Sequence, residues 1–103
     1  MGHGKYILDA EGEPKEVYDL IAWAKWFETA GSQRQFASTQ VSEDVRVSTV
    51  FLGLDHAFGS SPPILWETMI FGGEHDGYED RYSTKTEAEA GHAKAVELAR
   101  SST

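Results

Sequence analysis

The sequence predicts an α+β fold: an antiparallel four-stranded meander, preceded by a short N-terminal strand, with two helices packed on one face in the order β-α-β-β-β-β-α. Residues 16–30 carry apolar side chains at helical spacing. Residues 45–54 and 64–71 are rich in β-branched and aromatic residues, as strands are. Adjacent strands with short connections favour an antiparallel sheet whose helices gather on one face. The whole chain, 1–103, is predicted to be one domain.

The N-terminal third predicts a short strand and then a helix. Residues 5–8 form the strand candidate, closed by a polar turn over residues 9–14. Pro14 suits the start of a helix over residues 16–30, and Gly31 suits its end because glycine readily adopts the C-cap conformation. The residues expected to face the core share helical spacing: Val17, Leu20, Ile21, Ala24 and Phe27.

Four further segments read as strands: residues 34–41, 45–54, 64–71 and 78–82. The second half of residues 45–54 is apolar on both faces, and so is 64–71 except for Glu67. Strands of this kind are covered on both sides. We therefore expect the second face to be covered by another part of the chain or by a second subunit, and a homodimer through that face is the preferred explanation.

The last segment predicts a helix that begins with a capping box, Thr84 to Glu87, and continues to Arg100. Its expected packing face is rich in small residues: Ala88, Gly91, Ala95, Leu98 and Ala99. Small side chains predict a close approach of this helix to the sheet. His92 lies beside that face and is expected to be a half-buried structural residue.

Composition excludes several classes of function. The chain has 17 acidic and 9 basic residues and a net charge of −8, which disfavours direct binding to nucleic acid or to an anionic membrane and favours a basic partner. It has no cysteine, no apolar run long enough to span a membrane and no secretory leader, so we expect a cytoplasmic protein. No P-loop, dinucleotide fingerprint or Ser-His-Asp pattern is present, and we expect no cofactor and no catalytic residue.

Two segments are candidate partner-binding surfaces. The loop over residues 55–63 follows a central strand, and loops held by a rigid sheet often carry binding groups. The acidic turn over residues 74–80 would attract a basic partner. The candidate partner-binding residues are Asp55, His56, Phe58, Glu74, Asp76, Glu79 and Asp80. A structural alternative stays open for Asp55, whose carboxylate can cap the turn, and for His56 as a surface residue.

Glu67 interrupts an apolar strand, where a carboxylate without a partner is costly to bury. It predicts either a structural carboxylate, at the rim of the sheet or in an ion pair with an arginine on the sheet such as Arg46, or a functional carboxylate. An alternative ligand-binding set at an oligomer interface consists of Trp66, Glu67, Tyr78 and Arg81. A metal site built from His56, Glu67, His75 and Asp76 lacks the compact spacing of strong metal motifs, so no metal is predicted.

Four segments resemble a family of small proteins encoded in bacteriophage and prophage genomes. They are VSTVFLGLDH, PPILWETMIFGG, RYST and EAEAGH, at residues 47–56, 62–73, 81–84 and 87–92. The likeness extends to the tryptophan-containing first helix. The resemblance implies action in a bacterial cytoplasm during phage growth, and analogy with other small phage proteins implies binding to a host factor, including components of defence systems.

The lead hypothesis is a non-enzymatic phage or prophage accessory protein that binds and inhibits a host bacterial protein through an acidic loop surface. The loop over residues 55–63 and the acidic turn over residues 74–80 together are expected to form that one contact surface. An alternative from another class is an oligomer that sequesters a small molecule or a nucleotide. A metal-dependent hydrolase and a virion structural protein are two further alternatives.

Overall fold

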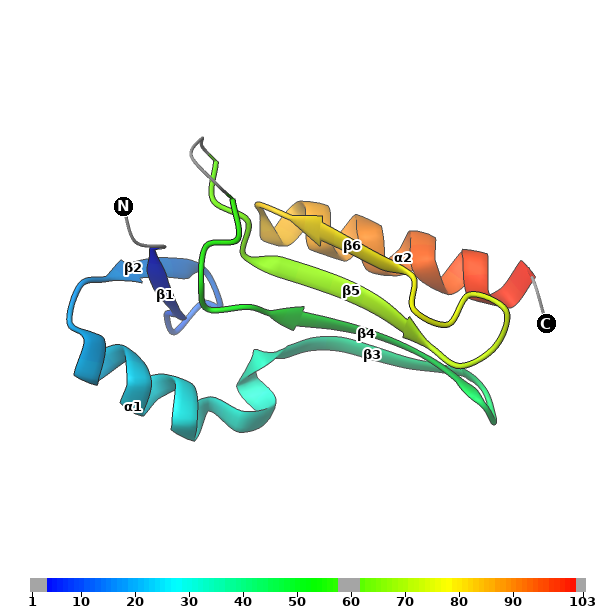
Figure 1. The fold of residues 1–103 in the computed structure, drawn as a ribbon, viewed down its shortest axis with the longest axis horizontal. Coiled ribbons are helices and arrows are strands. Elements are labelled where there is room, and N and C mark those ends of the chain that lie inside the picture. The colour runs from blue at the N-terminus through cyan, green and yellow to red at the C-terminus, as the bar shows by residue number, and fades with distance from the viewer. Residues whose placement is uncertain (1–3, 58–61, 102–103) are drawn as a thin grey trace.

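The computed structural model describes residues 4–57 and 62–101. Its main sheet is antiparallel, and its strands follow the order of the chain: β3 (Gln35–Ser42), β4 (Val45–Phe51), β5 (Trp66–Phe71) and β6 (Glu79–Tyr82). The long helix α2 (Lys85–Ser101) lies along one face of this sheet (Figure 1). The predicted α+β fold with a four-stranded antiparallel meander is confirmed.

The N-terminal part lies beyond the end of the main sheet (Figure 1). Strands β1 (Lys5–Leu8) and β2 (Pro14–Val17) form a separate two-stranded hairpin. Helix α1 (Leu20–Ala30) contacts that hairpin, and a short 3-10 turn, Gly31–Arg34, leads into β3. Hydrogen bonds from β1 to the segment after β4, including Tyr6 N–H to the Gly53 carbonyl at 2.8 Å, join the hairpin to the sheet.

Strand β2 was not predicted, and the predicted helix start at residue 16 is wrong. The Asp9 carboxylate accepts hydrogen bonds from the backbone N–H groups of Glu11 and Glu13, at 2.9 and 3.0 Å, and so closes a turn that returns the chain along β1. Pro14 is the first residue of β2, a position in which proline is tolerated. Asp19 instead caps α1, since its carboxylate accepts two backbone N–H groups of the first turn.

Helix α2 begins and packs as the sequence predicts. The Thr84 hydroxyl accepts the Glu87 N–H at 3.0 Å, and the Glu87 carboxylate accepts the backbone N–H of Thr84 at 3.1 Å, which completes the capping box. The small residues of the predicted packing face, Ala88, Gly91, Ala95 and Ala99, are buried, and Gly91 lies so close to β6 that a Cβ atom there would overlap the Tyr82 side chain. The predicted close approach of helix and sheet is confirmed.

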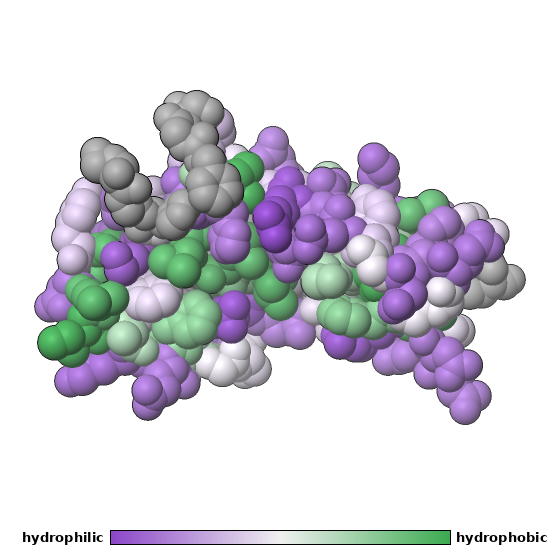
Figure 2. All heavy atoms as spheres, in the orientation of Figure 1, coloured by the Kyte–Doolittle hydropathy of each residue, from purple (hydrophilic) through white to green (hydrophobic). Residues whose placement is uncertain are grey.

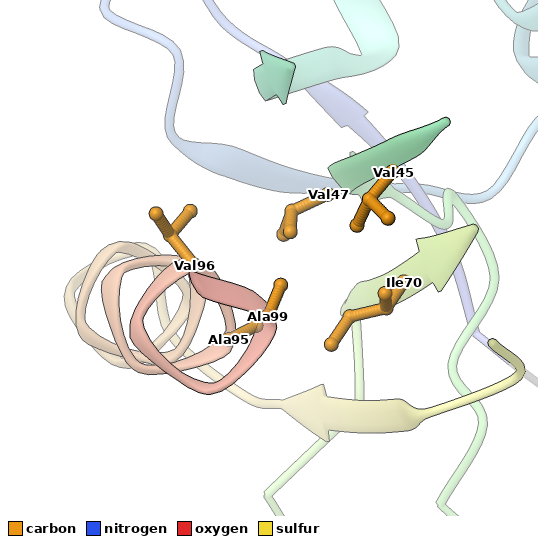
Figure 3. Close-up of a cluster of buried hydrophobic side chains, with 6 residues drawn as sticks. All are labelled: Val45, Val47, Ile70, Ala95, Val96 and Ala99. Atoms are coloured by element: carbon orange, nitrogen blue, oxygen red, sulfur yellow. The ribbon is translucent and has the colours of Figure 1, made fainter. Parts of the chain in front are cut away.

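The core lies between α2 and one face of the sheet. In Figure 3 the side chains of Val47 and Ile70 point from the sheet toward Ala95 and Ala99 of α2. A second cluster continues this core toward the N-terminal part and contains Phe51, Leu65, Trp66, Tyr82 and Ala88. Trp26 of α1 packs against that second cluster, with its ring 5.9 Å from the ring of Phe51. Both helices thus pack on the same face of the sheet. Helix α2 lies along the core, and α1 contacts the end of the core that contains Phe51.

The opposite face of the sheet, here called the open face, is not covered by any helix among residues 4–57 and 62–101. It is less apolar in practice than the sequence suggests, because polar side chains lie across it. The Gln35 amide donates to the Ser48 hydroxyl at 3.0 Å, and the Arg46 guanidinium lies 4.8 Å from the centre of the Phe71 ring. Phe71 itself is 40% exposed. The predicted homodimer through this face stays a prediction.

In the described part of the chain, no helix combines the length and the apolar character needed to cross a membrane.

Candidate functional site

Three large apolar side chains are exposed next to one another at the start of α1. Tyr18 is 86% exposed, Leu20 58% and Ile21 67%. Figure 2 shows hydrophobic residues gathered at the end of the molecule where α1 begins. Together with their acidic neighbours Glu16 and Asp19, these residues are called the α1 surface below. Adjacent exposed side chains of this size are a feature of interaction sites, whereas single ones are not.

Helix α1 exposes these residues because its other face already fills the contact with the rest of the protein. The Trp23 indole donates a hydrogen bond to the Gly53 carbonyl at 3.1 Å. The Phe27 ring packs against Gly53 as well, and the Arg34 guanidinium lies 4.1 Å from its centre. Since these rings and Trp26 face inward, the leucine and isoleucine of the first turn are left outward. The predicted core face of this helix is therefore wrong at Leu20, Ile21 and Ala24, all of which are exposed.

The acidic residues of the α1 surface are held by local hydrogen bonds. The Tyr18 hydroxyl donates to the Glu16 carboxylate at 3.1 Å, and this bond raises the pKa of Tyr18 above its ordinary value of 10.0. The Asp19 carboxylate accepts from the backbone N–H groups of Ile21 and Ala22 at 2.9 and 3.2 Å. Both carboxylates are on exposed residues, so the α1 surface combines an apolar centre with negative charge.

Among the residues predicted from sequence, Asp55 has the structural role that was left open for it. Its carboxylate accepts hydrogen bonds from the backbone N–H groups of Ala57 and Ile64, at 2.8 and 2.9 Å, and so ties together the two ends of the loop. His56 is half-buried, and its backbone N–H donates to the Ile64 carbonyl at 3.0 Å. Phe58 lies outside the described residues.

The acidic turn is likewise held by its own side chains. The Asp76 carboxylate accepts the Gly72 N–H at 2.7 Å, and the Asp80 carboxylate accepts the N–H of Arg81 at 3.0 Å. Glu79 lies 3.7 Å from the Arg81 guanidinium. Glu74 is exposed, with its carboxylate 3.9 Å from the ring of its neighbour His75.

The loop after β4 and the acidic turn after β5 lie at opposite ends of β5 (Figure 1). In an antiparallel meander successive connections alternate between the two ends of the sheet, which the sequence order alone makes unavoidable. The expectation that the two segments share one contact surface is therefore wrong. The acidic hairpin turn near Asp9 and the turn near Asp76 are also at opposite ends of the molecule.

The four residues of the alternative ligand-binding set lie on opposite faces of the sheet. Trp66 faces α2 in the core and is 1% exposed, and Tyr78 packs against the α2-facing cluster. Glu67 and Arg81 are register partners whose side chains meet on the open face. Because neighbouring residues of a strand point to opposite faces, Trp66 and Glu67 cannot line one pocket, and this set is corrected accordingly.

Glu67 forms an ion pair on the sheet, as one of its two predictions stated, but with Arg81 rather than Arg46. The Arg81 Nε atom is 2.9 Å from the carboxylate, and the Glu67 side chain is only 13% exposed. Within the described ranges, no three His, Asp or Glu side chains gather closely enough to hold a metal ion.

A cavity of about 500 Å³ lies between the β1–β2 turn and the inner side of α1. Its lining residues come from the hairpin, from α1 and from the 3-10 turn: Leu8, Asp9, Ala10, Gly12, Trp26 and Gln33. Trp26 is the aromatic residue of this lining, and Asp9 and Gln33 are polar residues in it. A cavity of this size is within the range of small-molecule sites.

No known protein family, curated protein or solved structure matches this chain. The resemblance to phage-encoded proteins therefore stays a prediction.

Sequence reasoning missed the α1 surface and the cavity. The signal for the first was present, because residues 20–27 carry apolar side chains on both sides of the helix: Leu20 and Ile21 on one, Trp23 and Trp26 on the other. A helix at the edge of a small domain can bury only one such side. The cavity depends on the packing of the β1–β2 turn beside α1, which the sequence did not reveal.

Proposed function

We propose that this protein is a non-enzymatic phage or prophage accessory protein that binds and inhibits a host bacterial protein, and that the α1 surface makes the contact. The observation that carries the proposal is the adjacent exposure of Tyr18, Leu20 and Ile21. Full burial of a leucine or isoleucine side chain is worth about 1.5–3 kcal/mol. Burial of these residues by a partner would contribute that free energy to binding.

The shape of the surface indicates the mode of binding. The exposed Ala24 lies at i+4 from Leu20 and at i+3 from Ile21, which are spacings used by a helix that lies in a groove. A tyrosine at the edge is typical of binding hot spots.

The charge of the surface indicates the chemistry of the partner. Glu16 and Asp19 flank the apolar residues, and the whole chain carries a net charge of −8. Complementary charges accelerate association and exclude wrong partners. The expected partner is therefore a protein with an apolar groove bordered by lysine or arginine.

Affinity capture from a lysate of the bacterial host tests this proposal. The wild type is compared with Leu20→Ser/Ile21→Ser and with a matched control, Phe71→Ser, which removes an exposed apolar side chain from the open face. We expect the wild type and the control to retain one host protein that the double variant loses, with weaker capture at higher salt. Equal capture by all three chains would refute the α1 surface as the contact.

A second candidate function, binding of a small molecule, is favoured by the cavity beside Trp26. Native mass spectrometry of the purified protein would show an added mass that disappears on denaturation. Gln33→Ala removes an exposed polar lining residue without touching the core, and it should weaken such a complex. A protein that carries no added mass and binds none from a host metabolite extract would exclude this candidate.

A further inference from the structure

The two edges of the main sheet differ in how well they are protected. Edge strand β6 has four residues, three of which are charged, whereas edge strand β3 has eight residues with no charge and no proline. Natural sheets protect their edges with short strands, charged residues, proline or bulges. The register shifts in β3, between Gln35 and Ala37 and between Gln40 and Ser42, leave residues 37–40 regular. The side-chain amides of Gln35 and Gln40 donate to the carbonyls of Ala37 and Ser42, at 2.8 and 2.7 Å. The rest of the outer backbone of β3 is open to another strand.

We propose that a second copy of this chain pairs antiparallel with β3 and extends the sheet across a two-fold axis at Thr39. The inference is independent of the proposed function, because it uses no residue of the α1 surface.

The faces of β3 are compatible with this register. Register partners in a sheet share a face. Ala37 pairs with Thr49, and Thr39 pairs with Val47, so Ala37 and Thr39 lie on the α2 side. Val41 packs against the α2-facing cluster and lies on that side as well.

On the open face are Ser38 and Gln40, which pair with Ser48 and Arg46. A two-fold axis at Thr39 brings Ala37 opposite Val41 of the second copy, and Ser38 opposite Gln40 of the second copy. Each pair then joins residues of the same face: apolar with apolar on the α2 side, and polar with polar on the open face. An axis between residues 38 and 39 would pair residues from opposite faces, which a continuous sheet does not allow.

The test compares the dimerisation of three chains by sedimentation equilibrium. The wild type is expected to be a dimer. Ser38→Glu/Gln40→Glu brings like charges opposite one another at two places and should weaken the dimer about tenfold. Ser38→Lys/Gln40→Glu changes the same two exposed positions but brings opposite charges together, so it should dimerise at least as well as the wild type. Thermal unfolding of each variant checks that the fold is retained.

Three results would overturn the proposal: a monomeric wild type, a glutamate double variant that dimerises like the wild type, or a charge-complementary variant that is monomeric. In the second case, dissociation of the dimer by Phe71→Glu would assign the contact to the open face instead.

Discussion

The imidazole of His92 in α2 lies 2.7 Å from the hydroxyl of Thr49 in the centre of the sheet. Thr49 also contacts the hydroxyl of Thr68 at 2.6 Å, and the other ring nitrogen of His92 lies 2.9 Å from the hydroxyl of Thr39. One histidine thus connects α2 to three neighbouring strands. Buried polar groups are stable only when they are paired, so this network fixes the position of the helix over the sheet.

The first prediction concerns the pH dependence of stability. Burial holds the pKa of His92 below its ordinary value of 6.5. The unfolded chain therefore binds a proton more readily than the folded chain, and the stability contributed by neutral His92 is present above pH 6.5 and is lost as the pH falls through the lower, folded pKa. Urea unfolding of the wild type and of His92→Gln across this range should show a decline that is steeper in the wild type. Parallel curves would contradict it.

The second prediction concerns the close contact of α2 with β6. Gly91→Ala should lower the free energy of unfolding by about 1–3 kcal/mol, because the added methyl group overlaps the Tyr82 ring. On an exposed helix surface the same change would stabilise by about 1 kcal/mol. The reverse change at an exposed position of α2, Ala93→Gly, measures this intrinsic difference between glycine and alanine in a helix. In a Tyr82→Leu background the cost of Gly91→Ala should disappear, and persistence of the cost would show that another contact causes it.

The third prediction separates a structural role of Glu67 from a functional one. Arg81→Met leaves the mostly buried Glu67 carboxylate without its 2.9 Å partner and should cost about 1 kcal/mol of stability. Glu97→Gln, which disrupts an exposed ion pair at 3.8 Å, should cost less than about 0.5 kcal/mol. Adding Glu67→Gln to Arg81→Met should recover part of the loss. Equal effects of the two single changes, measured by chemical denaturation, would argue against a structural ion pair.

The fourth prediction is that the two sides of α1 differ in their importance for folding. Leu20→Ser/Ile21→Ser should change the free energy of unfolding by less than about 1 kcal/mol in total, as exposed substitutions do. Trp26→Ala, which removes a ring packed against Phe51, should cost about 3 kcal/mol or more. If the serine variant were the less stable of the two, Leu20 and Ile21 would be core residues and not a contact surface.

Most of the fold could be predicted from the sequence because its signals are local. The strands β4 and β5 are dense in β-branched and aromatic residues, and Thr84 with Glu87 marks the start of α2. Strand β2 could not be predicted, since Pro14 and the charged residues after it favour a strand only when β1 is alongside. The pairing of β2 with β1 is a tertiary contact, which local sequence signals do not reveal.

The candidate site was harder to predict than the fold. Helical spacing identifies the apolar residues of α1 but not which of them face inward, and that choice is made by the fit of Trp23 and Phe27 against Gly53. Likewise, a carboxylate in a loop can bind a partner or its own backbone, and at Asp55 and Asp76 the backbone bonds are made. Only the folded arrangement distinguishes these cases.

Hydrogen–deuterium exchange of the protein with the partner that affinity capture retains tests the central claim most directly. If the α1 surface makes the contact, the backbone amides of residues 18–25 will exchange more slowly in the complex than in the free protein, while those of the turn over residues 72–78 will not change. Protection confined to the turn, with residues 18–25 unaffected, would contradict the claim and return the contact to the acidic segment after β5.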